Sequence, residues 1–91
     1  MTVFWVKRME KQVQSIVEMM DLVLGDPSVP RNVKRAVTDA KQKLMEPDEL
    51  TVRLTSAVYA LDEVSNDINI PMHARTLIWN LLSALETAKE R

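Results

Sequence analysis

The sequence predicts an all-α fold, specifically a four-helix bundle made of two tandem helical hairpins. Apolar residues recur at steps of three and four through four segments, which is the spacing of one helix face. Glycine occurs once and proline four times, too seldom for the frequent turns of an all-β chain. The two halves of the chain also match when one is shifted by 41 residues.

Length and composition fit a single domain over residues 1–91 with one apolar core. Hydrophobic residues make up 46% of the chain. A domain of this size buries roughly 60–65% of the surface that its unfolded chain exposes. Its stability therefore depends on close packing or on a second subunit. The absence of cysteine excludes disulfides and thiolate metal sites.

Charge and hydropathy argue against two classes of partner. The formal net charge is -1, whereas a dedicated nucleic-acid binder is usually strongly basic. No apolar run approaches the ~20 residues that span a bilayer. The apolar residues 3–6 precede Lys7 and Arg8, which is the reverse of the order in a signal peptide. We expect a cytoplasmic protein without a membrane partner.

The first hairpin is predicted to contain helices at residues 3–24 and 30–45. The first helix ends before Gly25, which we expect to adopt the left-handed conformation of a helix cap. The second begins at Pro30, because proline suits a first turn, and Ser28 is a candidate cap. It ends before Pro47. The apolar stripe of the first helix is Val6, Met9, Val13, Ile16, Met20 and Val23.

The second hairpin is predicted to contain helices at residues 47–65 and 71–90. Asp48 and Glu49 would place negative charge at the positive end of the third helix. The fourth helix begins near Pro71, with Asn69 as a possible cap.

The 41-residue repeat suggests how the hairpins combine. Its shared pattern reads V-x-x-(M/L)-D-x-V-x-x-D-x-x-(V/I)-P-x-x-(V/A)-(K/R). A repeated helix pair of this period is also typical of HEAT-type solenoids, but a stable solenoid needs roughly three such units. Two units can close on each other as a bundle, which we prefer to an open HEAT-like pair or a dimer that completes one.

The same repeat predicts two structural ion pairs. Asp21 and Lys34 are separated by 13 residues across the first turn, and Asp62 and Arg75 by 13 across the second. Residues at these positions are level in an antiparallel hairpin, so we expect a salt bridge in each.

Residues that specify catalysis are missing. His73 is the single histidine and has no evident partner for acid–base chemistry or metal binding. No phosphate-binding glycine loop or calcium loop is present. We expect no enzyme activity, no cofactor, no metal and no small-molecule substrate.

Two kinds of residue are candidates for an interaction surface. Trp5 and Trp79 are of the type enriched at interface hot spots, although for Trp79 a partly buried core position is the favoured interpretation. The second helix is basic and could contact phosphates, but it lacks aromatic residues for base stacking. Its cations on one side are Arg31, Lys34, Arg35 and Lys41, with Lys43 nearby.

One stretch is specific enough to suggest a family. The run LDEVSNDINIPMHARTLIWNLLSALE from Leu61 to Glu86, together with DPSVPRNVKRAV from Asp26 to Val37, resembles the archaeal uncharacterised protein family 0147. The resemblance covers about residues 13–88 and leaves the N-terminal VFWVKR segment outside. It implies a compact helical bundle in an archaeal cytoplasm and no particular activity.

The leading hypothesis is therefore a non-catalytic protein-interaction or scaffold module that self-associates or docks on a larger assembly. The alternative is an accessory protein of RNA or a ribonucleoprotein, acting through the basic second helix. A third reading is an enzyme or ligand binder with a polar pocket between helices that holds His73.

Overall fold

The computed structural model describes residues 2–89 of the backbone and the side chains of residues 10–89. Its four helices are α1 (Thr2–Leu24), α2 (Arg31–Met45), α3 (Leu50–Ser65) and α4 (Met72–Lys89). No strand occurs in the described backbone, so the predicted all-α class is confirmed. No helix in the described part carries a stretch long and apolar enough to cross a membrane.

The described helix bounds lie within one residue of the expected ones except at the start of α3, which begins three residues later than predicted. Asp48 accounts for the difference, because its carboxylate accepts a hydrogen bond from the Glu49 N–H at 2.8 Å in the loop. Glu49 itself is extended, at φ -61° and ψ 145°, and its carbonyl accepts the first helical bond from Arg53 at 3.0 Å. The acidic pair therefore organises the loop before α3 instead of forming its first turn.

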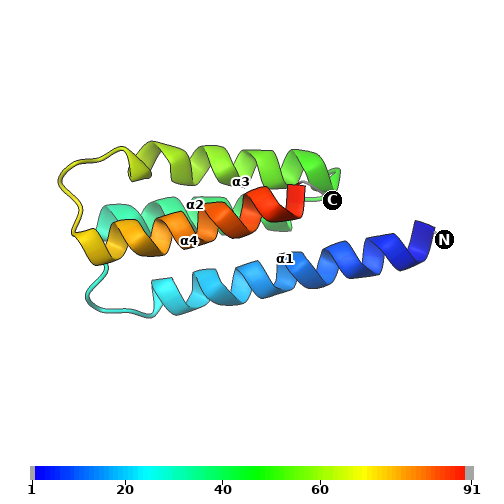
Figure 1. The fold of residues 1–91 in the computed structure, drawn as a ribbon, viewed down its shortest axis with the longest axis horizontal. Coiled ribbons are helices and arrows are strands. Elements are labelled where there is room, and N and C mark those ends of the chain that lie inside the picture. Colours follow the sequence, from blue (N-terminus) through cyan, green and yellow to red (C-terminus); the bar gives the residue numbers. More distant parts are fainter. Residues whose placement is uncertain (1, 90–91) are drawn as a thin grey trace.

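The helices close into a ring in which each runs antiparallel to its neighbours (Figure 1). α1 packs against α2 and α4, and α3 packs against the same two helices. The contact of α1 with α4 completes the ring, which confirms the four-helix bundle rather than an open HEAT-like pair. The α2–α3 seam is the most extensive of the four, and the α1–α4 seam is the least.

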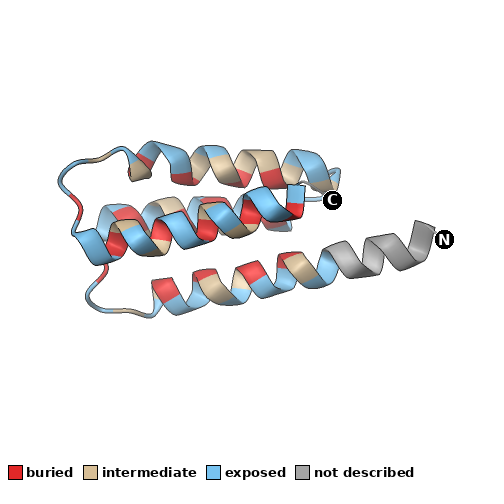
Figure 2. Ribbon diagram, in the orientation of Figure 1, coloured by how far each residue is buried: buried red, intermediate tan, exposed pale blue. Residues whose placement is uncertain are grey.

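The core follows the internal repeat. All 19 residues that are buried in the described part are apolar, and they line the inside of the bundle (Figure 2). Nine lie in the first hairpin, and each has a buried counterpart 41 residues further on. The pairs are Val13–Leu54, Ile16–Ala57, Met20–Leu61, Val23–Val64, Val29–Ile70, Val33–Ala74, Val37–Ile78, Ala40–Leu81 and Leu44–Leu85.

Side-chain size distinguishes the two seams that the repeat relates. Alanine lies on α2 or α3 at places where the equivalent residue on α1 or α4 is larger, and the distance between packed helices depends on the side chains between them. Small residues therefore explain why α2 and α3 pack more extensively than α1 and α4. The alanines and their larger equivalents are Ala36–Leu77, Ala40–Leu81, Ala57–Ile16 and Ala60–Met19.

Arg53 ties three helices together at the end of the bundle near the α2–α3 loop. Its Nε donates to the Leu44 carbonyl at 2.7 Å, and its Nη1 lies 3.0 Å from Glu10 Oε1. Leu44 is in the last turn of α2, where carbonyls lack partners inside the helix. The Arg53 side chain is only 15% exposed. Sequence spacing does not reveal this contact, because Glu10 and Arg53 are 43 residues apart.

Gly25 differs from expectation, since it does not adopt the left-handed conformation. Its N–H still donates to the Asp21 carbonyl at 3.0 Å, so it extends the helical hydrogen bonding of α1. Its equivalent in the second hairpin is Asn66, which is right-handed helical at φ -89° and ψ -2°. The position therefore does not require glycine.

We predict that Gly25→Ala stabilises the protein by about 0.4–1 kcal/mol, because alanine restricts the unfolded chain without straining the folded one. An added Cβ would lie 3.5 Å from the Asp21 carbonyl oxygen and 3.8 Å from that of Leu22, which are ordinary contacts. Urea unfolding measures the change. A lower unfolding free energy for the variant would show that the site is tighter than described.

We also predict that Arg53→Met lowers the unfolding free energy by about 1–3 kcal/mol. Methionine retains an apolar stem but cannot bind the Leu44 carbonyl or Glu10. The matched control is Arg35→Met, at an exposed position of α2, which should stay within about 0.5 kcal/mol of wild type. Equal effects of the two substitutions in urea would mean that Arg53 does not clamp the helices.

Candidate functional site

The two hairpin loops lie at the same end of the bundle and are built in the same way (Figure 1). Asp26 Oδ1 accepts a hydrogen bond from the Ser28 N–H at 2.9 Å, and Asp67 Oδ1 accepts one from the Asn69 N–H at 2.8 Å. These are equivalent positions of the repeat. Ser28 therefore belongs to the turn and does not cap α2, whose N-cap residue Pro30 makes no side-chain capping bond.

Two reciprocal hydrogen bonds join the hairpins at this end. The His73 Nε2 in the first turn of α4 lies 3.0 Å from Ser28 Oγ in the first loop. Asn32, the equivalent of His73 in the first turn of α2, donates from Nδ2 to Asp67 Oδ2 in the second loop at 3.1 Å. The two braces begin at equivalent positions of the repeat, 32 and 73, but end at positions that the repeat does not relate, Asp67 and Ser28.

His73 is exposed and belongs to this brace. The Ser28 hydroxyl donates to Asp26 Oδ1 at 2.6 Å, so this carboxylate orients the serine and not the imidazole. Hydrogen bonds from the Ser28 side chain and backbone lower the pKa of Asp26, and the positive charges of His73 and Lys34 add to this. A catalytic base is held in place by a further group that orients it. Here the contacts run from His73 to Ser28 and from Ser28 to Asp26, so Asp26 does not orient His73. No three His, Asp or Glu side chains in the described part form a metal site.

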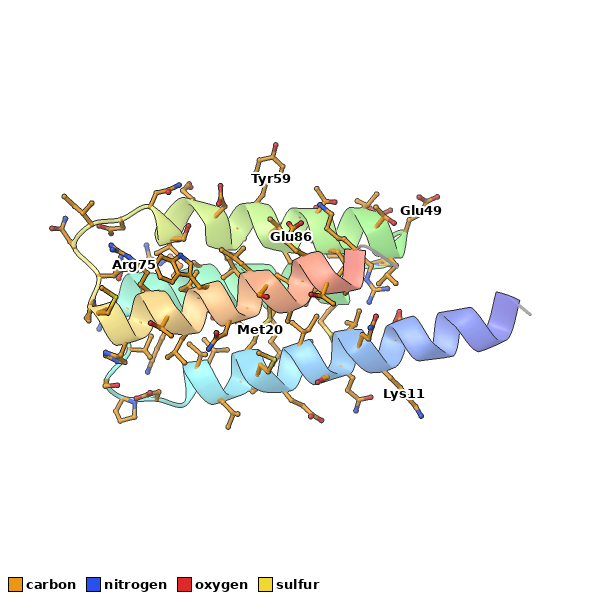
Figure 3. All side chains as sticks on the ribbon, in the orientation of Figure 1. Lys11, Met20, Glu49, Tyr59, Arg75 and Glu86 are labelled. Atoms are coloured by element: carbon orange, nitrogen blue, oxygen red, sulfur yellow. The ribbon has the colours of Figure 1, made fainter. Side chains whose placement is uncertain are left out.

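The most distinctive sequence motif, around residues 65–76, serves the fold. Arg75 lies at the loop end (Figure 3), and its Nη2 donates to the Asp67 carbonyl at 2.7 Å. Other polar residues of the motif also bind backbone carbonyls, which stabilises the end of α3 and the start of α4. Their bonds are Ser65 Oγ to the Asp62 carbonyl at 2.7 Å, Asn66 Nδ2 to the same oxygen at 3.1 Å, and Thr76 Oγ1 to the Met72 carbonyl at 3.1 Å.

The predicted ion pairs across the turns are wrong. Asp21 pairs with Lys41 at 2.7 Å and not with Lys34. Asp62 and Arg75 make no ion pair within the described side chains. The reason is that side chains tilt toward the N-terminus of their own helix. An acid before the turn leans away from it, while a base after the turn leans toward it. The level positions therefore diverge, and Lys41 reaches Asp21 from further along α2.

The basic side of α2 is partly neutralised by ion pairs. Lys41 is paired with Asp21, and Lys43 lies 3.8 Å from Glu46. The remaining cations lie in the first half of α2, where no aromatic residue lies between them in the sequence. They are Arg31, Lys34 and Arg35.

Large apolar residues are exposed at positions where the other hairpin is mostly polar. Among the described side chains, they are Leu22 at 77%, Met45 at 66%, Val52 at 43%, Tyr59 at 76%, Ile68 at 86%, Met72 at 67% and Trp79 at 53% exposure. Figure 3 shows Tyr59 pointing away from the bundle. Each exposed residue and its counterpart in the other hairpin form one of these pairs: Leu22–Glu63, Met45–Glu86, Val52–Lys11, Tyr59–Glu18, Ile68–Pro27, Met72–Arg31 and Trp79–Thr38. The fold therefore does not require large apolar residues at these places.

Two of these residues lie on one side of α4, and a third lies in the loop that precedes it. Met72 and Trp79 are seven residues apart, about two helical turns, so they share one side of α4, while Ile68 is in the α3–α4 loop; we call the three the α4 stripe. Trp79 is thus a surface residue and not part of the core. Trp5, the other predicted interaction residue, lies outside the described side chains.

Two grooves occupy equivalent seams but differ in chemistry. The α1–α4 groove, with a volume of about 240 Å³, is mainly apolar and is lined by Met19, Leu22, Val23, Asp26, Leu77, Asn80 and Leu81. Its equivalent between α2 and α3 is mixed in polarity, and five of its eight lining residues are polar or charged; the eight are Asn32, Arg35, Ala36, Asp39, Ala60, Glu63, Val64 and Asp67. Neither groove contains the deep polar pocket that the hidden-enzyme reading required.

Comparison with known proteins places the chain among archaeal proteins. The family described as "Uncharacterised protein family (UPF0147)" matches residues 2–88, which includes the N-terminal segment that the sequence resemblance left outside. A UPF0147 protein of Archaeoglobus fulgidus is 43% identical over 85% of this chain and 88% of its own length. One of Methanothermobacter thermautotrophicus is 47% identical over 82% of this chain and 74% of its own.

Solved structures share the fold. The crystal structure of the unknown-function protein MMP1188 matches with a TM-score of 0.77 and 42% identity, covering 84% of this chain and 88% of that one. A UPF0147 protein from Thermoplasma acidophilum matches with a TM-score of 0.80 and 31% identity, covering 87% of this chain and 94% of that one.

The bonds of Asp26 predict a pH dependence of stability. Its pKa in the folded protein is below the ordinary 3.8, so its contribution is present above pH 3.8 and is lost as the pH falls through the lower folded value. Asp26→Asn should therefore melt at a lower temperature than wild type at neutral pH, and the two curves should converge in acid. Thermal melts against pH measure this, with Asp39→Asn on exposed α2 surface as the control. A gap that persists well below pH 3.8 would contradict the assignment.

Proposed function

The chain belongs to the uncharacterised protein family UPF0147, a family of unknown function, and we propose that it is a non-catalytic module that binds another protein through the α4 stripe. The observation that carries this proposal is the exposure of Ile68, Met72 and Trp79 at places where the equivalent hairpin has Pro27, Arg31 and Thr38.

The internal repeat supplies a control for the proposal within one molecule. Both hairpins fold in the same way and bury equivalent residues, so the requirements of the fold at equivalent places are similar. A large apolar side chain in water contributes little to stability, whereas its burial against a partner is favourable by about 25 cal/mol per Å². Tryptophan and methionine are both enriched in protein interfaces. The α4 stripe can therefore contribute favourable free energy to binding, although it contributes little to the stability of the fold.

The partner is expected to be a protein with an apolar ridge, and Trp79 is the expected anchor residue. No comparable observation supports the alternative of an RNA-associated protein. Two of the five α2 cations are engaged by acidic side chains, and no aromatic residue accompanies the other three.

The test uses the equivalent hairpin as the source of the substitutions. Met72→Arg with Trp79→Thr installs the residues that already occupy those places in the first hairpin. We expect the wild-type protein to capture a defined set of proteins from an archaeal lysate, with and without nuclease. The double variant should capture them at least about tenfold less well, which corresponds to the loss of about 1.4 kcal/mol.

The control is Lys34→Glu with Arg35→Glu, which should leave the capture unchanged. Thermal melts would first establish that both double variants fold. Capture that survives in the Met72/Trp79 variant would overturn the proposed surface. Capture that disappears with nuclease and in the Lys34/Arg35 variant would replace it with the nucleic-acid reading.

A further inference from the structure

Trp79 lies on the side of α4 that faces α3. Leu77 and Asn80 line the groove with α1, so they mark the side of α4 that faces α1. Trp79, Leu82 and Glu86 follow one another at steps of three and four on the opposite side of the helix. Because α4 packs against α1 on one side and α3 on the other, these three residues lie along the seam with α3.

Asp62 lies on the α3 side of the same seam. Ser56 and Glu63 line a groove with α2, so they mark the side of α3 that faces α2. Asp62 is on the opposite side, four residues after Val58, which packs against the core. Asp62 therefore shares one surface with the three residues of α4. We call this surface the α3–α4 face, and it comprises Asp62, Trp79, Leu82 and Glu86.

The internal repeat places Leu82 next to Asp62. In the first hairpin, Asp21 pairs with Lys41 at 2.7 Å, and the equivalents of these two residues are Asp62 and Leu82. The second hairpin therefore keeps the acid and has an apolar residue in the place of its base. Asp62 is exposed, and it makes no ion pair among the described side chains.

The cations of α4 have other contacts. Arg75 donates from Nη2 to the Asp67 carbonyl at 2.7 Å, and Lys89 lies 3.9 Å from Glu86. Neither residue pairs with Asp62. Within the described part of the chain, the α3–α4 face thus combines an apolar centre with a carboxylate that no side chain neutralises.

We propose that the partner segment bound by the α4 stripe is a basic amphipathic helix, an inference that rests on the proposed function. The helix lies along the α3–α4 seam, with apolar residues against Trp79 and Leu82 and a lysine or arginine against Asp62. That cation takes the place which Lys41 occupies beside Asp21 in the first hairpin. α4 has 18 residues and is about 27 Å long, which matches a partner helix of about five turns.

Charge complementarity selects this partner. A segment that covers Trp79 also removes water from the neighbouring carboxylate of Asp62, which costs free energy unless a cation or a donor replaces the water. A basic helix supplies that cation, whereas an acidic helix or a nucleic acid adds repulsion. Apolar residues at helical spacing are also how amphipathic helices bind an apolar surface.

The first experiment selects peptides from a displayed library on the full-length protein. The library contains amphipathic helices of about 18 residues, with Leu, Ile, Phe or Met on the apolar side and Lys, Arg, Glu or Gln beside it. Selection on the wild type should enrich Lys or Arg at the flanking positions. Selection on Asp62→Lys should reduce that enrichment. Flanking positions that show no preference for cations, or that prefer Glu, would overturn the inference.

The second experiment titrates one selected basic peptide, carrying a fluorophore, and follows its anisotropy. Asp62→Lys should weaken binding by at least about fivefold, because it replaces an ion pair with repulsion. The matched control is Asp21→Lys, which changes the net charge equally on the α1–α2 seam and should bind within about twofold of wild type. Equal effects of the two substitutions would show a response to net charge alone and would contradict the proposed contact.

Two further variants keep this result independent of folding. The Asp62 carbonyl accepts hydrogen bonds from Ser65 and Asn66, and Asp62→Lys leaves this backbone group in place, so the variant should melt as the wild type does. Asp62→Asn is the smaller change and should weaken binding by about two- to fivefold. Leu82→Lys should also weaken binding, because it supplies Asp62 with a base from within the chain.

The Met72→Arg, Trp79→Thr variant separates this inference from the proposed function. If the selected peptides show no preference for cations but lose binding to that variant, the α4 stripe stands and the basic partner is excluded. If no peptide is enriched on the wild type, or if the selected peptides bind the variant unchanged, the α4 stripe is wrong and this inference fails with it.

Discussion

The structure depends on one constraint, which is that a helical hairpin with a single apolar face cannot bury that face by itself. Nine buried residues of the first hairpin have buried equivalents in the second, and all of them belong to one apolar core cluster. Because burial of apolar surface is the dominant favourable term in folding, the second copy is a condition of stability for the first. The polar braces from Asn32 and His73 at the loop end act within this arrangement and fix how the two hairpins meet.

Sequence periodicity predicted the helices, the repeat and most of the core because each of these depends on local spacing or on apolar character. It failed where three-dimensional direction decides. Asp21 pairs with Lys41 and not with Lys34, because side chains tilt toward the N-terminus of their own helix, which draws Asp21 and Lys34 apart across the turn. Gly25 was expected to be left-handed because glycine often is at helix ends, yet the chain continues in a right-handed conformation there.

Contacts between distant parts of the chain were also beyond sequence reasoning. Arg53 reads as an ordinary surface residue of a helix, and only the packed bundle brings it to Glu10 and to the end of α2. Of the candidate site, the exposure of Trp79 settled one of two stated alternatives. The α4 stripe had one sequence signal that was available: a comparison of the two repeats shows Met72 against Arg31 and Trp79 against Thr38. Only the exposure of Met72 and Trp79 in the structure shows that these differences between the repeats lie on the surface and not in the core.

The equivalence of the two hairpins has a consequence for how surfaces of this fold can diversify. In an assembly of two identical hairpins, any substitution appears at both symmetry-related places, so a groove that gains a leucine gains it twice. When the α2–α3 loop links the hairpins in one chain, a residue can be changed in one hairpin without the same change in the other. One seam can remain polar with Glu63 while the other becomes apolar with Leu22. Because the two hairpins are covalently linked, their buried residues can stay equivalent while their exposed residues differ.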